Sequence, residues 1–459
     1  MEKDTQLREV GNDLTEGKIL PKLVRFVLPL LLANIVQQLY NTVDMAIIGH
    51  YVGSIGTVGV SAGGNIASFL TMVASGFAGA AQIYISQLSG SKDKTSIAET
   101  VSTILTFMLV IAAALAAISL IFCRTFLLWL NCPKDAFQQA VGYMLIVSLG
   151  YPFIFGYNAI CGIMRGVGES KKPLYFITVA AISNVFMDLL LVAVIPLEAI
   201  GTAIATVIAQ MVSFIAAIRF VLKNESKFQF KLNLSSFRIH KKHLNIILKT
   251  GIPLVAQSAF IQFSQLFCIS YINGFGLTAS ATNSIGEKIQ RLINIFMTSI
   301  TQGTGAMLGQ NIGAQKHERV PKIVYTALGC SLLCATFSSA ISVFAPHIAF
   351  SVFTNDPEVI EFGVIYLRIC VILYYLSAIQ GCFQSVTTGC GNTKLNLISG
   401  ILDGIVLRIG ISFLLAYRFE MGVIGFFYGN ALARIAPVII HYLFFRSNKW
   451  REFKLLDKQ

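Results

Sequence analysis

Apolar runs of about 20 residues, the length of helix that crosses a bilayer core of ~30 Å, recur along this 459-residue chain. Charged residues make up only 12% of the sequence, against about 25% in soluble globular proteins. A transmembrane β-barrel would instead alternate apolar and polar residues in strands of about ten residues. We therefore predict an all-α integral membrane protein.

The apolar runs predict twelve transmembrane helices, at residues 23–48, 57–87, 98–122, 136–162, 173–196, 199–222, 245–272, 284–310, 322–348, 360–388, 396–417 and 420–445. Lys and Arg gather in alternate connections, and the opposite connections hold only Arg124, Lys134 and Arg418. Because basic loops face the cytoplasm, both termini are predicted to be cytoplasmic in a multi-pass protein of the cell (inner or plasma) membrane. The formal charge of +13 then reflects topology and attraction to membrane lipid, and no nucleic-acid partner is expected.

The two halves of the chain align at a shift of about 223 residues, with QLSGSK (87–92) over QNIGAQ (310–315) and RGVGESKKPL (165–174) over TGCGNTKLNL (388–397). Six spans is an even number, so both halves share one orientation, as in the parallel repeats of transporters. Residues 1–22 mix both charges and lack the apolar core of a signal peptide. The predicted parts are a cytoplasmic segment 1–22, six-helix lobes 23–222 and 245–445 around a central cavity, a cytoplasmic linker 223–244 and a cytoplasmic tail 446–459.

Four of the 22 acidic residues fall clearly within the predicted spans rather than at their ends, namely Asp44, Asp188, Glu287 and Asp403. A charge inside the membrane is costly, so such residues are functional candidates. Glu287 is expected to pair with Arg291, four residues later. For Asp403, pairing with Arg408 and a functional role remain alternatives, because a spacing of five suits an α-helix poorly. Asp44 and Asp188 have no Lys or Arg at membrane depth in the first half, so a proton, an ion or a ligand must neutralise them.

The rise of the helices predicts that Asp44, Asp188, Thr206 and Tyr143 share a layer in the outer half of the first lobe. Asn184 precedes Asp188 by four residues and therefore shares its helix face. Oxygen ligands suit a hard cation, so Asp44, Asn184, Asp188 and Thr206 are a candidate Na⁺ site. Two nearby acids also suit a proton carrier, and the choice between Na⁺ and H⁺ stays open.

The first span carries a polar stripe at a spacing of three or four residues, made of Asn34, Gln37, Asn41 and Asp44. Such a stripe must face protein or a water-filled cavity rather than lipid. Together with Tyr143, its amides form the predicted substrate cavity and coupling network. Pro29 and Pro253 stand at equivalent places in the two halves, where each will kink its helix as a fixed bend or as a hinge.

Three segments carry a family resemblance: LYNTVDMAIIGHYVG (39–53), QLSGSKD (87–93) and RGVGESKKPL. Together with the twelve-span repeat, they resemble the prokaryotic branch of the multidrug and toxic compound extrusion (MATE) family over residues 15–445. The resemblance implies a secondary active antiporter that exports organic, cationic, drug-like compounds in exchange for Na⁺ or H⁺, with no cofactor. We also expect a monomer.

In a branch of that family, an Asp on the first helix and Asn-x-x-x-Asp on the fifth form a cation site in the N-terminal lobe, near a Thr on the sixth and a Tyr on the fourth. The matching residues here are Asp44, Asn184, Asp188, Thr206 and Tyr143. Another branch has acids on the seventh and tenth helices, which are absent here, so coupling in the C-terminal lobe is not expected. The resemblance also favours a gating bend at Pro29.

The sequence also bears on two other functions. A lipid-linked saccharide flippase of the same superfamily handles anionic headgroups and should place Arg or Lys in its cavity, yet the first half has none at depth. A membrane-embedded enzyme should show a nucleophile and base or a histidine cluster, and the six His form no cluster within the spans. RGVGESKKP lacks the spacing of a nucleotide-binding loop. The antiporter is therefore the prediction, the flippase is the alternative, and no enzyme is expected.

Overall fold

The computed structural model describes residues 13–224, 237–453, 455 and 456 of the chain. Every regular element among these residues is helical, and no strand occurs in them. The first half contains α1 (Ile19–Tyr51), α2 (Gly53–Ser91), α3 (Lys94–Trp129), α4 (Lys134–Leu149), α5 (Tyr151–Gly166), α6 (Lys171–Asp188), the π-helix η1 (Leu189–Val194) and α7 (Glu198–Lys223).

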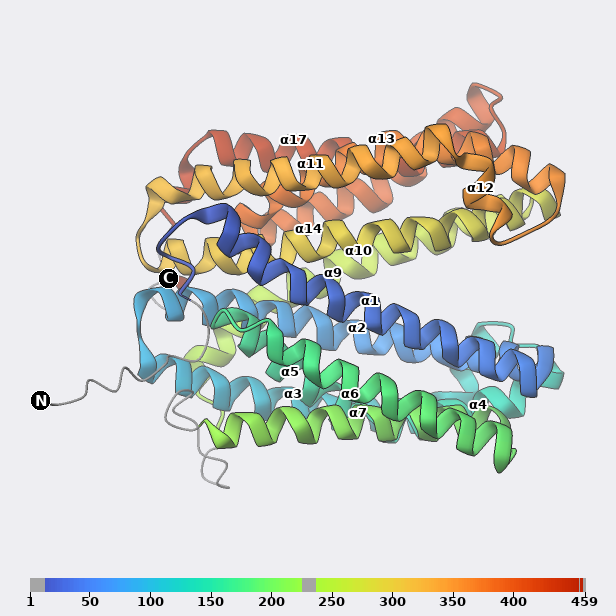
Figure 1. The fold of residues 1–459 in the computed structure, drawn as a ribbon, viewed down its shortest axis with the longest axis horizontal. Helices are drawn as coiled ribbons and strands as arrows, with labels where there is room; N and C mark the ends of the chain where they lie inside the picture. Colours follow the sequence, from blue (N-terminus) through green and yellow to red (C-terminus); the bar gives the residue numbers. More distant parts are fainter. Residues whose placement is uncertain (1–12, 225–236, 454, 457–459) are drawn as a thin grey trace, which may run out of the picture. The chain divides into compact units, whose positions relative to one another are not determined.

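The second half contains α9 (Lys241–Asn273), α10 (Leu277–Gly313), the 3₁₀ turn η3 (His317–Arg319), α11 (Val320–Phe344), α12 (Pro346–Ser351), α13 (Pro357–Gly389), α14 (Thr393–Ile401), the π-helix η4 (Leu402–Ile409), α15 (Gly410–Phe413), the π-helix η5 (Leu414–Arg418), α16 (Val423–Leu432), α17 (Ile435–Arg446) and the 3₁₀ turn η6 (Lys449–Arg451). The helices of each half run mostly along a common direction (Figure 1). The predicted all-α membrane fold is confirmed.

Ten of these helical segments are long and apolar enough to cross a membrane, and α4 with α5 makes an eleventh span bent by 51°. Within the described residues, α10 accounts for the remaining predicted crossing: it has 37 residues, although it is too polar to count among the ten. The bend in the fourth span was not predicted. It follows from Pro152 in the first turn of α5, because proline has no N–H to continue the hydrogen bonding of α4.

The helices begin at residues that satisfy their first N–H groups. The Asp93 carboxylate accepts a hydrogen bond from Ser96 N at 3.0 Å and begins α3. Asp356 does the same for α13, accepting from Glu358 N at 3.0 Å. Short polar side chains in this position satisfy N–H groups that have no partner within the helix.

The described residues divide into two compact units. One contains Leu32–Leu248, and the other contains Thr15–Leu31 and the chain from Lys249 onward. The first unit therefore extends into the start of α9, where the buried His243 ring is 2.7 Å from Glu99 Oε2 and 2.8 Å from Tyr84 Oη. Helix α1 passes from one unit to the other between Leu31 and Leu32, two residues after Pro29.

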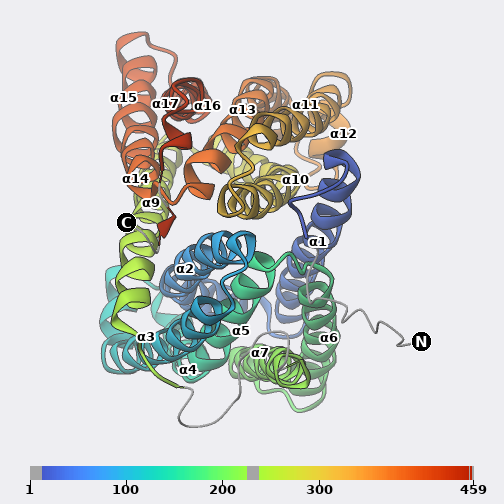
Figure 2. The same cartoon turned by 90° about the vertical axis from the view of Figure 1, so that its left-hand side faces the viewer.

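The two units repeat the same set of helix pairings. In the first, α2 packs on α3, α4 and α5, and α6 packs on α7; in the second, α10 packs on α11 and α13, and α15 packs on α16. Figure 2, which looks along the helices, shows α6 beside α7 and α10 beside α11. Close approaches depend on glycine: a Cβ at Gly162 of α5 would lie 2.4 Å from the Ala78 carbonyl oxygen of α2. Small residues allow such contacts between membrane helices.

Three predicted parts fall partly outside the described residues. The cytoplasmic segment 1–22 includes residues 1–12, and the linker 223–244 includes residues 225–236. The tail 446–459 includes residues 454 and 457–459. The boundaries of these parts therefore stay predictions.

Candidate cation site

Asp44 is directed toward α6 and α7 by the packing of the turns that precede it. Ala33, Val36 and Tyr40 of α1 pack in a cluster with Ile177 and Ala180 of α6 and Ala209 of α7. Residues four apart share a helix face, so Asp44 lies on the face of α1 that carries Tyr40. Apolar packing on the preceding turns thus fixes which helices the carboxylate meets.

The residues opposite Asp44 lie on the faces of α6 and α7 that pack against α1. Asn184 and Asp188 continue the face of α6 that begins at Ile177, and both are buried, at 1% and 0% exposure. Thr206 is one turn from Ala209 on α7. The Asp44 side chain lies close enough to both Asp188 and Asn184 to interact with them. The structure therefore brings Asp44 of α1 together with Asn184 and Asp188 of α6, which stand 140 and more positions later in the sequence. Thr206 lies on the face of α7 that packs in the same cluster.

The polar atoms of this cluster are not satisfied by protein. Among the described residues, these buried atoms have no hydrogen-bond partner: Asp44 Oδ1, Asn184 Oδ1 and Nδ2, Asp188 Oδ1 and Oδ2, and Thr206 Oγ1. Neither carboxylate forms a salt bridge within that part of the chain. Buried polar groups are nearly always hydrogen-bonded in proteins, so these oxygens fit a hard monovalent cation or a shared proton.

Two tyrosines lie beside the acids. Tyr143 of α4 is buried, with its ring against Gly63 of α2, and it interacts electrostatically with Asp44 and Asp188. Tyr40, which the sequence analysis did not select, interacts with Asp44. Its place one helical turn before Asp44 was the signal that could have identified it.

The rest of the predicted polar stripe differs in exposure. Gln37 and Asn41 are exposed in the isolated chain, and Asn34 is half-buried. Gln37 interacts with the hydroxyl of Tyr40, as does Gln210 of α7. Of the four stripe residues, Asp44 joins the acid cluster, whereas Gln37 reaches that cluster through Tyr40.

The other two acids within the spans are paired with arginine. Glu287 Oε2 lies 3.5 Å from Arg291 Nη2 on α10, as predicted. Asp403 Oδ1 lies 2.7 Å from Arg408 Nη2, and both side chains are buried. The spacing of five residues works because both lie in η4, a π-helix, in which hydrogen bonds join residues five apart. The structure thus shows the pairing alternative for Asp403.

The chain matches one family model in both halves. The model named MatE matches residues 29–190 and again residues 253–414. The chain belongs to the MatE family. Family members are ion-coupled membrane transporters, and the two matches are the internal repeat that the sequence predicted.

Relatives of this MatE chain match over nearly its whole length. The probable multidrug resistance protein YpnP of Bacillus subtilis is 24% identical, covering 97% of this chain and 99% of the relative. YoeA of the same organism, also named a probable multidrug resistance protein, is 22% identical, covering 94% and 96%. A solved outward-facing multidrug resistance MATE transporter of the MOP superfamily has a TM-score of 0.88 and 18% identity, covering 98% and 99%. That likeness shows that the folds agree.

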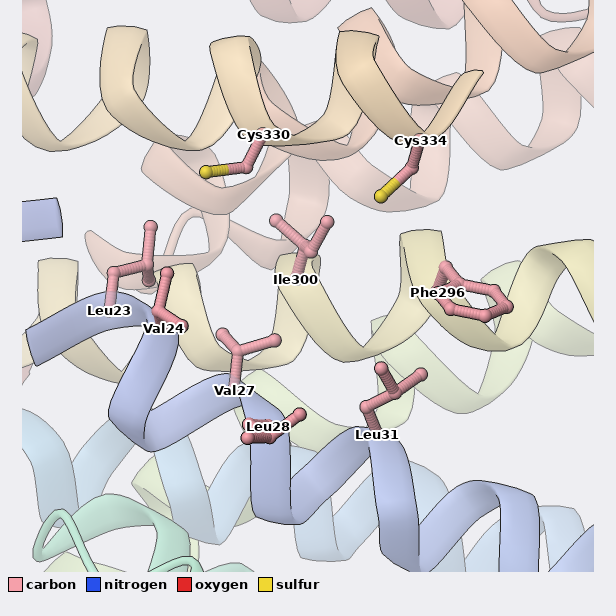
Figure 3. Close-up of a pocket in the computed structure, with 9 residues that line it drawn as sticks. All are labelled: Leu23, Val24, Val27, Leu28, Leu31, Phe296, Ile300, Cys330 and Cys334. Carbon is pink, nitrogen blue, oxygen red and sulfur yellow. The ribbon is translucent and has the colours of Figure 1, made fainter. Parts of the chain in front are cut away.

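The second unit of this MatE protein has an apolar pocket of about 170 Å³. It is lined by Leu23, Val24, Val27, Leu28, Leu31, Phe296, Ile300, Cys330 and Cys334. Figure 3 shows the two cysteines of α11 across from the α1 residues, with Ile300 of α10 nearby. The pocket has no charged lining residue, so its chemistry differs from that of the acid cluster. The lining also shows which surfaces the first turns of α1 contact in this unit.

Proposed function

We propose that this chain is a secondary active multidrug exporter that expels organic, cationic, drug-like compounds in exchange for Na⁺ or H⁺. One observation carries the proposal. Two carboxylates, the half-buried Asp44 and the fully buried Asp188, lie close enough to interact, with no protein cation paired to either among the described residues. Such a pair is stable only when a mobile positive charge is nearby. The relatives named as multidrug resistance proteins support the substrate class.

The coupling cation would be held by Asp44, Asn184, Asp188 and Thr206. Filling the site removes the repulsion between the two carboxylates and draws Asp44 of α1 toward α6. Emptying the site restores that repulsion. The state of charge at Asp44 is thereby linked to how the second part of α1 packs.

The link to transport runs along α1. Pro29 removes one backbone hydrogen bond from α1 and lies two residues before the point where the helix changes unit. We therefore place a hinge at Pro29, so that a change in packing at Asp44 bends the helix there. Pro253, inside α9, is the equivalent hinge candidate in the second half.

The proposal also assigns roles to the residues around the site. Tyr143 and Tyr40 respond to the charge of the cation site and form the coupling network beside it. Asn34, Gln37 and Asn41 form the polar surface of α1 that meets substrate and water. The proposal also includes cytoplasmic termini, which the basic loops predict, and a monomeric state. The flippase is not favoured by relatives named as multidrug resistance proteins.

The test is drug efflux from proteoliposomes, with sodium and pH gradients imposed separately. Export driven by one gradient identifies the coupling ion, and Asp44→Asn and Asp188→Asn should each abolish that coupled export. Glu287→Gln is the matched control, because Glu287 already has Arg291 as its partner. Wild-type coupled export by both Asp variants would refute the site, and lipid flipping without drug export would favour the flippase.

A further inference from the structure

The second unit contains a counterpart of the acid cluster with the charge reversed. The two family matches begin at residues 29 and 253 and end at 190 and 414, a shift of 224 residues at both ends. The same shift takes Asp44, Asn184, Asp188 and Thr206 to Cys268, Arg408, Ser412 and Asn430. These four also gather in space: Cys268 interacts with Arg408 and Ser412, and Arg408 Nη1 donates to Asn430 Oδ1. Cys268 and Ser412 thus stand in place of the two carboxylates, and the guanidinium of Arg408 stands in place of the Asn184 amide.

A second arginine adds to this positive charge. Arg434 lies at the break between α16 and α17, and its Nη1 donates to Gln380 Oε1 at 3.0 Å. The same Nη1 lies 3.6 Å from Asp403 Oδ2, while Asp403 Oδ1 already accepts from Arg408. Among the described residues, two guanidiniums thus share one carboxylate, leaving one positive charge in excess.

This excess charge lies deep in the membrane. Arg434 is twelve residues from Arg446 at the end of α17, or ~18 Å at the rise of a helix. Asp403 is ten residues, or ~15 Å, from Thr393 at the start of its span. Both distances place the cluster near the middle of the ~30 Å core, where an unbalanced charge is strongly disfavoured.

Both guanidiniums keep a donor for a further ligand. The Nε atoms of Arg408 and Arg434 are buried, and neither has a hydrogen-bond partner in the described part of the chain. The Arg408 side chain is itself only 2% exposed, and that of Arg434 is 22% exposed. The cluster therefore has both a charge to balance and donors to satisfy, and Arg434 is the member that a ligand can reach.

We propose that Arg434 and Arg408 form a binding site for a monovalent anionic group, either a free anion such as chloride or the carboxylate of a zwitterionic substrate. Guanidinium suits this chemistry because its planar donors match small anions and carboxylates. Asp403 holds the two arginines in place and sets the net charge of the site at plus one. The site stands on its own residues and does not depend on the proposed coupling at Asp44.

The test of binding uses the purified full-length protein in detergent, with gluconate as the inert anion. Wild type should broaden the chloride NMR signal, and acetate should displace the chloride. Arg434→Gln removes the excess charge and should weaken chloride binding by about tenfold or more, the worth of one charge-assisted hydrogen bond. Asp403→Asn raises the net charge and should strengthen binding, with chloride stabilising this variant more than wild type. Arg291→Gln, which alters an exposed arginine of the same unit, should change nothing.

Transport separates the two sources of the anion. If the ligand is a substrate carboxylate, Arg434→Gln should reduce export of a carboxylate-bearing zwitterionic drug and spare a cationic dye without a carboxylate. If it is a free anion, export of both should depend on chloride in wild type and lose that dependence in Arg434→Gln. Equal broadening by wild type and Arg434→Gln, or equal loss in Arg291→Gln, would overturn the site.

Discussion

Asp188→Asn should remove the stabilisation of the folded protein by the coupling cation. The substitution keeps the shape and one oxygen ligand but deletes a charge at a side chain that is 0% exposed. Two unit charges about 4 Å apart interact by about 4 kcal/mol at an effective dielectric constant of 20. Losing that attraction, offset in part by the smaller desolvation of asparagine, should weaken cation binding about a hundredfold to a thousandfold.

The assay is thermal unfolding of purified protein in detergent, with sodium replaced by a bulky organic cation at constant ionic strength. At a sodium concentration one hundred times its dissociation constant, wild type gains about 2.7 kcal/mol. At about 2.1 cal/mol/K of unfolding entropy per residue, this raises the Tm of a 459-residue chain by about 3 °C. Asp188→Asn should gain less than about 0.5 kcal/mol at the same concentration. A parallel series in pH at fixed sodium gives the corresponding comparison for a proton.

Asp44→Asn should behave like Asp188→Asn, and the double variant should be little worse than either, because both carboxylates serve one cation. Glu287→Gln supplies the control and should keep the wild-type response. The reasoning is refuted if Asp188→Asn retains both the sodium response and the pH response of wild type. It is also refuted if Glu287→Gln loses them to the same degree.

Two further predictions concern stability. Arg408→Met should destabilise the protein by about 3 kcal/mol, because Asp403 keeps Arg434 as a partner at 3.6 Å. Asp403→Leu should destabilise it by about 5 kcal/mol, because two arginines then lack a carboxylate partner. Equal losses of stability in thermal unfolding would contradict this order. Asp93→Ala should cost about 1 kcal/mol as a lost helix cap. The hydrogen bond from Ser96 N lowers the pKa of Asp93, so this contribution is present above the unfolded pKa of about 3.9 and is lost as pH falls through the lower folded pKa. A difference from wild type that persists in unfolding scans below that range would count against the cap.

The membrane helices could be predicted because the bilayer imposes their length and apolar character. Helices α2 and α9 begin four residues before the predicted spans, since polar end residues continue the helix beyond the hydrocarbon. The break at Gly150 was missed because Tyr151 and Pro152 continue an apolar run. Proline was nevertheless a local signal that a new helix begins there.

The candidate site could be predicted in part. Asp44, Asn184 and Asp188 were found because a charge in the membrane is conspicuous and a spacing of four indicates a shared face. The pairing of Asp403 with Arg408 could not be decided from the sequence, because it depends on a π-helix that no sequence pattern predicted. Arg434 is the only Lys or Arg in the apolar run 420–445, and a search for basic as well as acidic residues within the spans would have found it.

The division of α1 between two units has a consequence for how the protein is made. Val27 packs on Gly303 of α10, and the neighbouring Leu28 lines a pocket with Cys330 of α11. The ribosome therefore completes residues 15–31 long before it has synthesised the surfaces on which they pack. We expect this segment to remain in contact with lipid or the insertion machinery until the second half is made. A protein truncated after its first half would therefore enter the bilayer without the helices on which the first turns of α1 pack.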